Sequence, residues 1–379
     1  MPDRSIARLD AWTAESPPRD VKEALERLRR APDVHRVAVM PDVHLSKEVC
    51  VGTVVATERT LYPAAVGGDI GCGMIASAFD VEASRVDDER RARSILDGLR
   101  EAIPIIHHPR HASPDLPEGL ARATLGAPEL ERIKHRVASQ QIGTLGRGNH
   151  FVELQSDDDG RLWAMIHSGS RGMGQAIRKH WESVGARVRG GLQALDVDSS
   201  EGRAYLADVE WALGYAEANR ELLLEALGRV VADVVGGEAA PESRIGCHHN
   251  FVRRESHAGE ELWVHRKGAI SARDGEPGII PGSMGSTSYH VIGRGCAASL
   301  ASSSHGAGRR LSRARARRVV TPDELVRQME GVWFDARMAH GLREEAPEVY
   351  KDVTKVMRAQ KALTRTVRRL RPLLSFKGT

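Results

Sequence analysis

Short apolar runs along the chain predict buried strands. Residues 37–40, 52–57 and 162–166 are dominated by Val, Ala, Met, Ile and Thr, and polar or turn-forming residues follow each run. Runs of this length, bounded by turn signals, are typical of strands packed on both faces. Strand and glycine-loop character returns over residues 245–305.

Helical periodicity fills much of the remaining chain. Residues 84–102 are expected to be helical, because apolar side chains recur there at helical spacing. Residues 174–230 form the longest helical pattern, with a break around 196–200. Residues 321–371 are also expected to be helical, since Thr321 can cap a helix that begins with a proline and two acids.

The order of these elements predicts a fold that contains both α and β structure, with functional loops at the strand ends. Glycine-rich polar segments follow the predicted strands, and long helical insertions separate them. Neither an internal repeat nor a long low-complexity linker divides the sequence. We therefore expect residues 1–379 to form one compact catalytic domain, with an active site assembled from strand-end loops.

Composition narrows the class of protein only slightly. The 379 residues are 41% hydrophobic and 28% charged, which is typical of a soluble globular protein. The sequence shows neither a bilayer-spanning apolar run nor a secretory signal, so we expect a cytoplasmic protein without a membrane partner. The net charge of +4 neither requires nor excludes a polyanionic partner.

Two stretches concentrate arginine. Six arginines fall between residues 309 and 318, directly after a glycine-rich motif, and this position favours contact with phosphate. Five more fall between residues 358 and 371, where a solvated face is the simpler interpretation. The four cysteines form no Cys-x-x-Cys pair, which indicates free thiols in this setting.

The segment at 65–74 is the first strong candidate for chemistry. Four glycines surround Asp69 and Cys72, so a flexible loop carries a carboxylate and a thiol close together. Such a pair can bind a divalent cation, and a thiolate can bridge two of them. A tight turn with a buried cysteine is the alternative.

Histidines recur in similar loops. His150 follows Gly148-Asn149, His167 ends a predicted strand before Arg171, and His248 and His249 are adjacent. Alternation along a strand would place Asn149 and Glu153 on the face opposite His150. A histidine in an extended segment also faces away from its neighbour, so only one of the 248–249 pair can face a common site.

Together these residues form a mixed oxygen, nitrogen and sulfur ligand set. That set suits Mn²⁺, Zn²⁺, Fe²⁺ or Co²⁺ better than Mg²⁺ or Ca²⁺, and composition does not choose among the first four. The loop at 277–286 offers backbone N–H groups that can cradle an anion, although it is not a P-loop. His305, followed by Gly-Ala-Gly-Arg, can be a base, a metal ligand or a nucleophile. His44 can equally be a structural histidine in a loop, with its hydrogen bonds made to the protein.

Eight segments carry a resemblance to a known family. In order they are Pro41-Asp42-Val43-His44, Gly68-Asp69-Ile70-Gly71-Cys72-Gly73, Gly148-Asn149-His150-Phe151, His167-Ser168-Gly169-Ser170-Arg171-Gly172, Cys247-His248-His249-Asn250, Arg266-Lys267-Gly268-Ala269, Pro281-Gly282-Ser283-Met284-Gly285 and Ser304-His305-Gly306-Ala307-Gly308-Arg309. Together they closely resemble the RtcB family of RNA ligases, from about residue 37 to Lys377-Gly378.

The resemblance implies a single compact α+β domain with mixed β-sheets. It also implies an enzyme that joins an RNA 3′-phosphate or 2′,3′-cyclic phosphate to a 5′-hydroxyl, using GTP and two Mn²⁺ ions. It implies that Asp69, Cys72 and His150 hold one ion, that Cys72, His167 and His249 hold the other, and that His305 becomes guanylylated. The implied nucleotide contacts are Asn149, Glu153, His249, Asn250, Pro281, Gly282, Ser283, Met284, Ser286, His305, Gly306, Ala307, Gly308 and Lys377. The implied RNA or phosphate contacts are Arg171, Lys267, Arg309 and Arg313. RNA repair or tRNA splicing is the implied role, and an archease-like protein the implied activating partner.

Departures from the family pattern lie outside the implied ligands and nucleophile. Ser46 and Glu48 stand where the family usually has glycine, and Gly68 stands where valine is common. These changes point to altered substrate choice or partner dependence, as in a divergent paralogue dedicated to RNA repair. A metal-dependent phosphodiesterase or cyclic-phosphate hydrolase, and a non-catalytic RNA-binding paralogue, are the alternative functions. His305 distinguishes the ligase from both, because a hydrolase needs no nucleophilic histidine.

Overall fold

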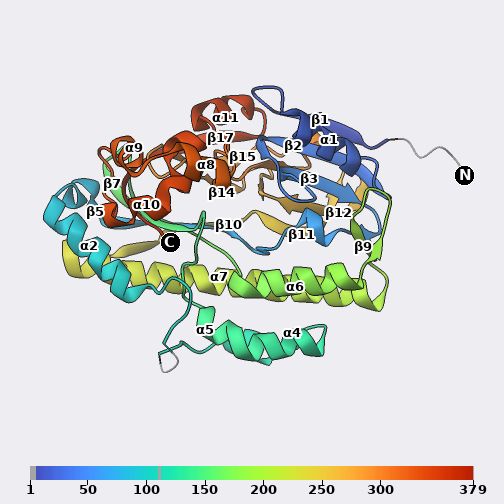
Figure 1. Cartoon of the computed structure of the whole chain (residues 1–379), viewed down its shortest axis with the longest axis horizontal. Coiled ribbons are helices and arrows are strands. Elements are labelled where there is room, and N and C mark those ends of the chain that lie inside the picture. Colours follow the sequence, from blue (N-terminus) through green and yellow to red (C-terminus); the bar gives the residue numbers. More distant parts are fainter. Residues whose placement is uncertain (1–5, 110–111, 379) are drawn as a thin grey trace, which may run out of the picture.

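Two β-sheets, a larger antiparallel one and a smaller mixed one, form the centre of the fold, and the computed structural model describes residues 6–109 and 112–378 (Figure 1). The larger sheet contains, in spatial order, β10 (Ala239–His248), β5 (Gly73–Glu82), β7 (Arg161–Ser168), β6 (Phe151–Asp157), β17 (Thr364–Phe376), β15 (Ser288–Gly293) and β14 (Pro277–Ile280). The second contains β1 (Arg8–Ala11), β2 (Val34–His44), β3 (Val51–Thr57), β12 (Glu260–Lys267) and β11 (Asn250–His257). The expected α+β class is confirmed. The expectation of mixed sheets is wrong for the larger sheet, whose strand pairs are antiparallel, and right for the second, where β1 runs parallel to β2.

Smaller strand groups connect these sheets to the loops. β13 (Ala269–Ser271) pairs with β16 (Ser302–Ser304), so the strand before His305 is tied to the end of the 266–269 motif. A further three-stranded group contains β4 (Thr60–Leu61), β9 (Gln193–Asp196) and β8 (Ala186–Arg187). These pairings bring loops that are distant in sequence to one region of the molecule.

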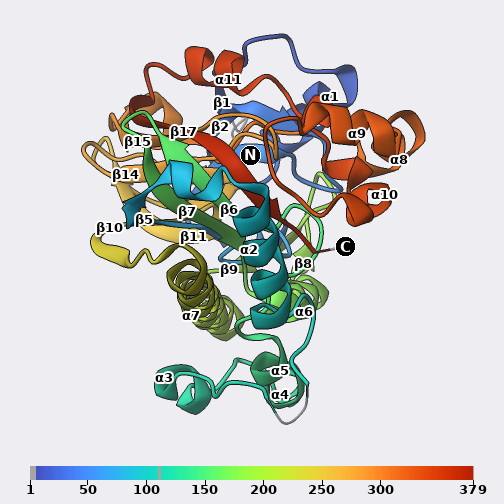
Figure 2. The ribbon, with the colours of Figure 1, turned by 90° about the vertical axis from the view of Figure 1, so that its left-hand side faces the viewer.

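Helices cover the sheets on both sides. The helices are α1 (Arg19–Leu28), α2 (Glu89–Ala102), α3 (Glu118–Arg122), α4 (Pro128–Ile133), α5 (Ser139–Gln141), α6 (Arg171–Val184), α7 (Ser200–Val235), α8 (Arg313–Val319), α9 (Pro322–Gln328), α10 (Ala339–Leu342) and α11 (Val353–Ala359). Figures 1 and 2 show α6 and α7 beneath the sheets, α3 to α5 beyond them, and α8 to α11 on the opposite side. Among the described residues, no helix combines the length and apolar character needed to cross a bilayer.

The core explains why the long helices form where the periodicity predicts them. The apolar face of α2, including Ile95 and Leu99, packs with Leu223 and Leu227 of α7 against the larger sheet. Ser199 caps α7 by accepting the N–H of Gly202, close to the expected break. That break is wider than expected, because residues 185–199 also contain β8 and β9.

The C-terminal helix expected over 321–371 is wrong beyond residue 359. The capping box at Thr321 and Glu324 starts α9 as predicted, and α11 follows later. Residues 364–376, however, form β17, which lies between β6 and β15 in the larger sheet. The arginines of β17 do not alternate regularly and are largely exposed. The strand is stabilised instead by the buried residues near its C-terminal end.

Candidate active site

A cavity of about 1410 Å³ collects the predicted loops around one space. Its lining includes the ends of β2, β6, β7 and β12, the 281–288 loop, and the segment 305–313. Glycine is required where these loops touch. Gly308 has a φ of +75°, and a Cβ there would come 2.2 Å from the backbone oxygen of Asp42. The loop after His305 therefore packs directly against the end of β2.

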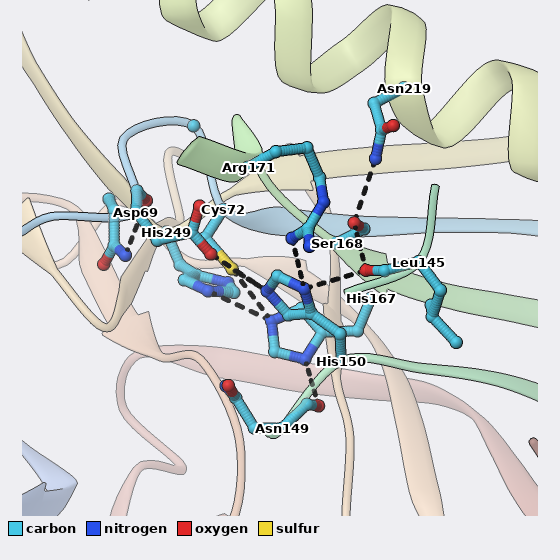
Figure 3. Close-up of polar contacts among 12 residues, drawn as sticks. Asp69, Cys72, Leu145, Asn149, His150, His167, Ser168, Arg171, Asn219 and His249 are labelled. Atoms are coloured by element: carbon cyan, nitrogen blue, oxygen red, sulfur yellow. Dashed lines mark hydrogen bonds and ion pairs between the residues drawn. The ribbon is translucent and has the colours of Figure 1, made fainter. Parts of the chain in front are cut away.

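Five predicted ligands lie together, and all of them except His150 line this cavity (Figure 3). The Oδ2 of Asp69 lies 2.9 Å from His150 Nε2, and Cys72 Sγ lies 3.5 Å from the same nitrogen. On the other side of Cys72, Sγ lies 3.2 Å from His167 Nε2, which is 3.4 Å from His249 Nε2. Cys72 thus belongs to two groups of three possible ligands.

The orientation of the histidines fits a bound cation. The Nδ1–H of His167 donates to the carbonyl oxygen of Asn149 at 3.1 Å, which leaves the Nε2 lone pair facing His249 Nε2 and the Cys72 sulfur. His249 Nδ1 is buried and has no hydrogen-bond partner among the described residues. Lone pairs that face one another are favourable only around a shared positive charge. The donor set is therefore compatible with a divalent metal.

Because the cluster is buried, its ligand side chains need the positive charge of a bound metal ion to take their ligating forms. Burial raises the pKa of the Cys72 thiol well above its ordinary value and lowers the pKa values of His167 and His249 well below theirs. Burial opposes ionisation of Asp69 as well, yet the hydrogen bond and charge of His150 lower its pKa. A thiolate at Cys72 therefore needs a cation beside it.

Arg171 and the α7 residue Asn219 support the cluster from behind. Arg171 Nη1 and the Leu145 carbonyl both lie 3.0 Å from His150 Nδ1. Asn219 Nδ2 donates to Ser168 Oγ at 2.9 Å, and that hydroxyl donates to the same Leu145 carbonyl (Figure 3). Arg171 also has a φ of +57°, an uncommon conformation for a side chain of its size.

His305 lies beside the cluster, and its ring is 4.7 Å from that of His249 between centroids. Its Nδ1–H donates to Asp42 Oδ2 at 2.6 Å, and its backbone N–H donates to the same oxygen at 3.2 Å. Asp42 is fully buried. This contact fixes the imidazole tautomer and leaves the lone pair on Nε2, as a nucleophile or base requires.

The same cavity is lined by residues expected to contact a nucleotide. Asn149, Phe151 and Glu153 line the cavity, as the strand alternation predicts, whereas Val152 enters the core. Lys377 Nζ lies 5.3 Å from the centroid of the Phe151 ring. Pro281 and the three residues that follow it line the same cavity, with Ser286, Gly306 and Ala307 nearby. Two expected free N–H groups of that loop are paired internally, since Gly282 and Ser283 donate to serine hydroxyls.

Asn250 and the two adjacent histidines have separate contacts. Asn250 donates to the Asp69 carbonyl at 2.9 Å and accepts the N–H of Gly268 at 2.8 Å. It therefore braces two of the loops while it lines the cavity. As the extended backbone predicts, His249 faces the cluster, whereas Nδ1 of His248 lies 3.0 Å from the carbonyl of Gly71.

The expected phosphate contacts differ in how free their side chains are. The guanidinium of Arg309 donates to Glu345, Tyr350 and the carbonyls of Glu344 and Leu311. Phosphate contact by Arg309 therefore requires some of these bonds to be exchanged. Arg313 has a side chain 44% exposed, 3.4 Å from Glu344 and 3.7 Å from Glu345, and is freer to move.

Lys267 is the most enclosed of these cations. Burial lowers its pKa to about 8, and its Nζ donates to the carbonyl of Ala64 at 3.2 Å. The neighbouring loop carries Glu48, one of the departures from the family pattern, which forms an ion pair with Arg178 of α6. That pair fastens the 45–50 loop beside the glycines that precede Asp69.

Comparison with known proteins agrees with this arrangement of motifs. A family model described as "tRNA-splicing ligase RtcB" matches residues 24–125 and 119–378. The chain belongs to the RtcB family. It is 35% identical to the RNA-splicing ligase RtcB of Escherichia coli strain K12, over 98% of both chains. It is 30% identical to the tRNA-splicing ligase RtcB of Archaeoglobus fulgidus, over 90% of this chain and 87% of the relative.

Sequence reasoning missed two groups in this RtcB site. Asp42 was visible only as part of a motif whose histidine drew attention, and its pairing with His305 spans 263 positions. Glu345 is the second, a carboxylate 2% exposed that lies 3.2 Å from Lys377 Nζ and accepts the hydroxyl of Tyr350 at 2.5 Å. A glutamate in a short helical segment gives no sequence signal of this role.

Proposed function

We propose that this chain is an RNA ligase that joins 3′-phosphate or 2′,3′-cyclic phosphate ends of RNA to 5′-hydroxyl ends, using GTP and Mn²⁺. One observation carries the proposal. His305, with Nδ1 held by a buried carboxylate, lies next to two groups of metal ligands that share Cys72. A hydrolase would need the metal groups but not an oriented nucleophile beside them.

Asp69, Cys72 and His150 would hold one ion, and Cys72, His167 and His249 the other. When bound, these ions would offset negative charge on the phosphates. The protein contributes orientation, because the carbonyl of Asn149 fixes the ring of His167 and the loop of Asp69 is braced by Asn250.

His305 performs the first chemical step in this proposal. Its Nε2 lone pair attacks the α-phosphorus of GTP, a phosphorus–nitrogen bond forms, and the bond to the bridging oxygen breaks as pyrophosphate leaves. The ring becomes cationic, and Asp42 Oδ2 stabilises it through the Nδ1–H bond of 2.6 Å. No proton has to leave Nδ1 during this step.

The next step returns His305 to its starting state, and the step after it joins the RNA ends. A 2′,3′-cyclic phosphate end is first opened by water, which bonds to phosphorus as the bond to the 2′-oxygen breaks, leaving a 3′-phosphate and a 2′-hydroxyl. An oxygen of the RNA 3′-phosphate then attacks the phosphorus of the GMP on His305, and the phosphorus–nitrogen bond breaks with its electron pair returning to Nε2. The 5′-hydroxyl oxygen then attacks the RNA phosphorus, GMP leaves, and the hydroxyl proton passes to solvent. Lys267 and Arg313, which line the cavity, supply positive charge along this path, and Arg309 holds the loop that carries His305. Arg171, expected to contact phosphate, does not line the cavity and contacts His150 instead.

The chain would act as one catalytic domain in this proposal. The cavity is lined by residues from Thr13 to Lys377, and the last strand, β17, lies inside the larger sheet. A shortened chain without β17 would therefore lose both Lys377 and a central strand.

The direct test is to incubate purified, folded protein with α-labelled GTP and Mn²⁺. We expect a covalent GMP adduct that is labile in acid and stable in alkali, as a phosphoramidate is. A matched sample treated with a chelator should form none. Folded, metal-loaded protein that releases phosphate from RNA ends without forming the adduct would instead support the hydrolase.

The charge of Glu153 should make nucleotide binding depend on pH. Burial raises its pKa to about 8, against the hydrogen bond of Gln155 and the charge of Lys377. The N–H groups of guanine are best accepted by the charged carboxylate. Affinity should therefore rise about tenfold per pH unit below about 8 and level off above it, with a proton released on binding.

Titration calorimetry with GTP between about pH 6.5 and pH 8.5 checks this expectation. Glu153→Gln should remove the slope that the wild type shows beyond the ionisation of GTP itself. Ser156→Ala, on the same strand, should keep it. An equal slope in Glu153→Gln and wild type would exclude Glu153 as the titrating contact.

A further inference from the structure

Lys351 makes an unusual pair of contacts at the end of β2. Its Nζ donates to the carbonyl oxygens of Pro41 at 3.0 Å and Val43 at 2.6 Å, the residues on either side of Asp42. Its backbone N–H donates to the carbonyl of Gly308 at 2.8 Å. One residue from the segment before α11 therefore contacts both the strand that carries Asp42 and the loop that carries His305.

The backbone around Asp42 sets the position of its carboxylate. Oδ2 accepts two hydrogen bonds from His305, whereas the buried Oδ1 has no partner among the described residues. The carbonyl of Asp42 itself lies 2.9 Å from Nδ1 of His44. Together, Lys351 and His44 form hydrogen bonds to the carbonyl oxygens of Pro41, Asp42 and Val43.

A fully buried carboxylate also needs compensating charge. Lys351 supplies an ammonium group whose charge acts on Asp42 and Glu15, and Glu15 forms an ion pair with Lys355 at 3.1 Å. Because the ammonium bonds to carbonyls and not to the carboxylate, Asp42 stays available to His305. Lys351 is thus placed to fix Asp42 without competing for its oxygen.

We propose that Lys351 is a positioning residue for the Asp42–His305 pair, holding the Pro41–Val43 backbone so that Asp42 orients the nucleophilic imidazole. The proposal rests on the guanylyl-transfer function proposed above. Loss of the ammonium would free two buried carbonyls and let Asp42 shift from Nδ1. A displacement of about 1 Å at a reacting group costs on the order of 10²-fold in rate.

The experiment compares Lys351→Met, which keeps the aliphatic stem, with Lys361→Met, an exposed lysine close in sequence. Single-turnover formation of the GMP adduct is measured across GTP concentrations. We expect Lys351→Met to lower the saturating rate about 10²-fold with little change in the half-saturating GTP concentration. Lys361→Met should match the wild type. A raised half-saturating concentration with an unchanged rate would show phosphate contact and overturn the positioning role.

A double variant adds a readout that a general loss of packing would not give. Asp42→Asn alone should slow the reaction, and adding Lys351→Met should cost little more, because both changes disable one unit. Fully additive losses would overturn the proposal. If Lys351→Met does not fold, Lys351→Gln, which can still donate to one carbonyl, should show a smaller loss with the same non-additivity.

The imidazole itself can be observed without any reaction. In ¹⁵N-histidine-labelled protein, the short Nδ1–H bond of His305 should give a far-downfield proton resonance, assigned by its absence in His305→Ala. It should persist in Lys361→Met and move upfield or broaden in Lys351→Met. An unchanged resonance and rate in Lys351→Met would refute the inference alone, whereas a wild type that forms no adduct would refute the proposed ligase function.

Discussion

Replacing His305 with alanine will give a folded protein that binds metal and forms no covalent GMP adduct. The phosphorus–nitrogen bond needs a ring nitrogen with a free lone pair, and Nε2 of His305 is the one that Asp42 orients in this way. The five cluster residues do not include His305, so metal binding should persist. Adduct formation with α-labelled GTP and calorimetric titration with Mn²⁺ measure the two properties separately.

His135→Ala is a suitable control, because that side chain is 77% exposed and lies in the helical segment between α4 and α5. It should form the adduct as the wild type does. Adduct formation by His305→Ala would move the nucleophile to another histidine, and His249 would be the first to examine because its ring is 4.7 Å away. Loss of metal binding in His305→Ala would show that the residue is a ligand.

The local hydrophobic pattern was sufficient to predict those helices and strands whose own sequence shows which side chains are buried. β2, β3 and β7 contain the short apolar runs 37–40, 52–57 and 162–166, and α2 and α7 bury apolar residues in the core. β17 shows the limit of this reasoning. Its arginines lie on largely exposed positions, and its strand conformation depends on pairing with β6 and β15, which a local pattern does not contain.

The same distinction applies to the site. The cluster residues were candidates because they stand in Gly-, Asn- or Ser-containing loops at strand ends, whereas the choice of His249 over His248 came from the family resemblance. The structure brings the five together. Asp42 and Glu345 act through partners far away in sequence, such as His305 and Lys377. The local sequence around a buried carboxylate does not indicate which distant residue it contacts, so these two roles are visible only in the folded structure.

Replacing Cys72 with serine should disrupt both metal groups at once. The sulfur is the one ligand common to Asp69 and His150 on one side and to His167 and His249 on the other. A serine hydroxyl stays protonated and neutral near pH 7, so neither ion keeps its shared anionic ligand. We expect Mn²⁺ affinity to fall by more than the roughly 100-fold that loss of an outer-shell partner costs. Adduct formation should fall with it.

Calorimetric titration and electron paramagnetic resonance of bound Mn²⁺ measure this loss independently of the reaction. Cys296→Ser is the matched control, because Cys296 is half-buried outside the cluster. Its metal content should equal that of the wild type, which should bind two ions per chain. If Cys72→Ser still binds both ions with wild-type affinity, the thiolate is not the bridge. If it loses only one, Cys72 serves a single ion, and the remaining residues would identify which group retains the other.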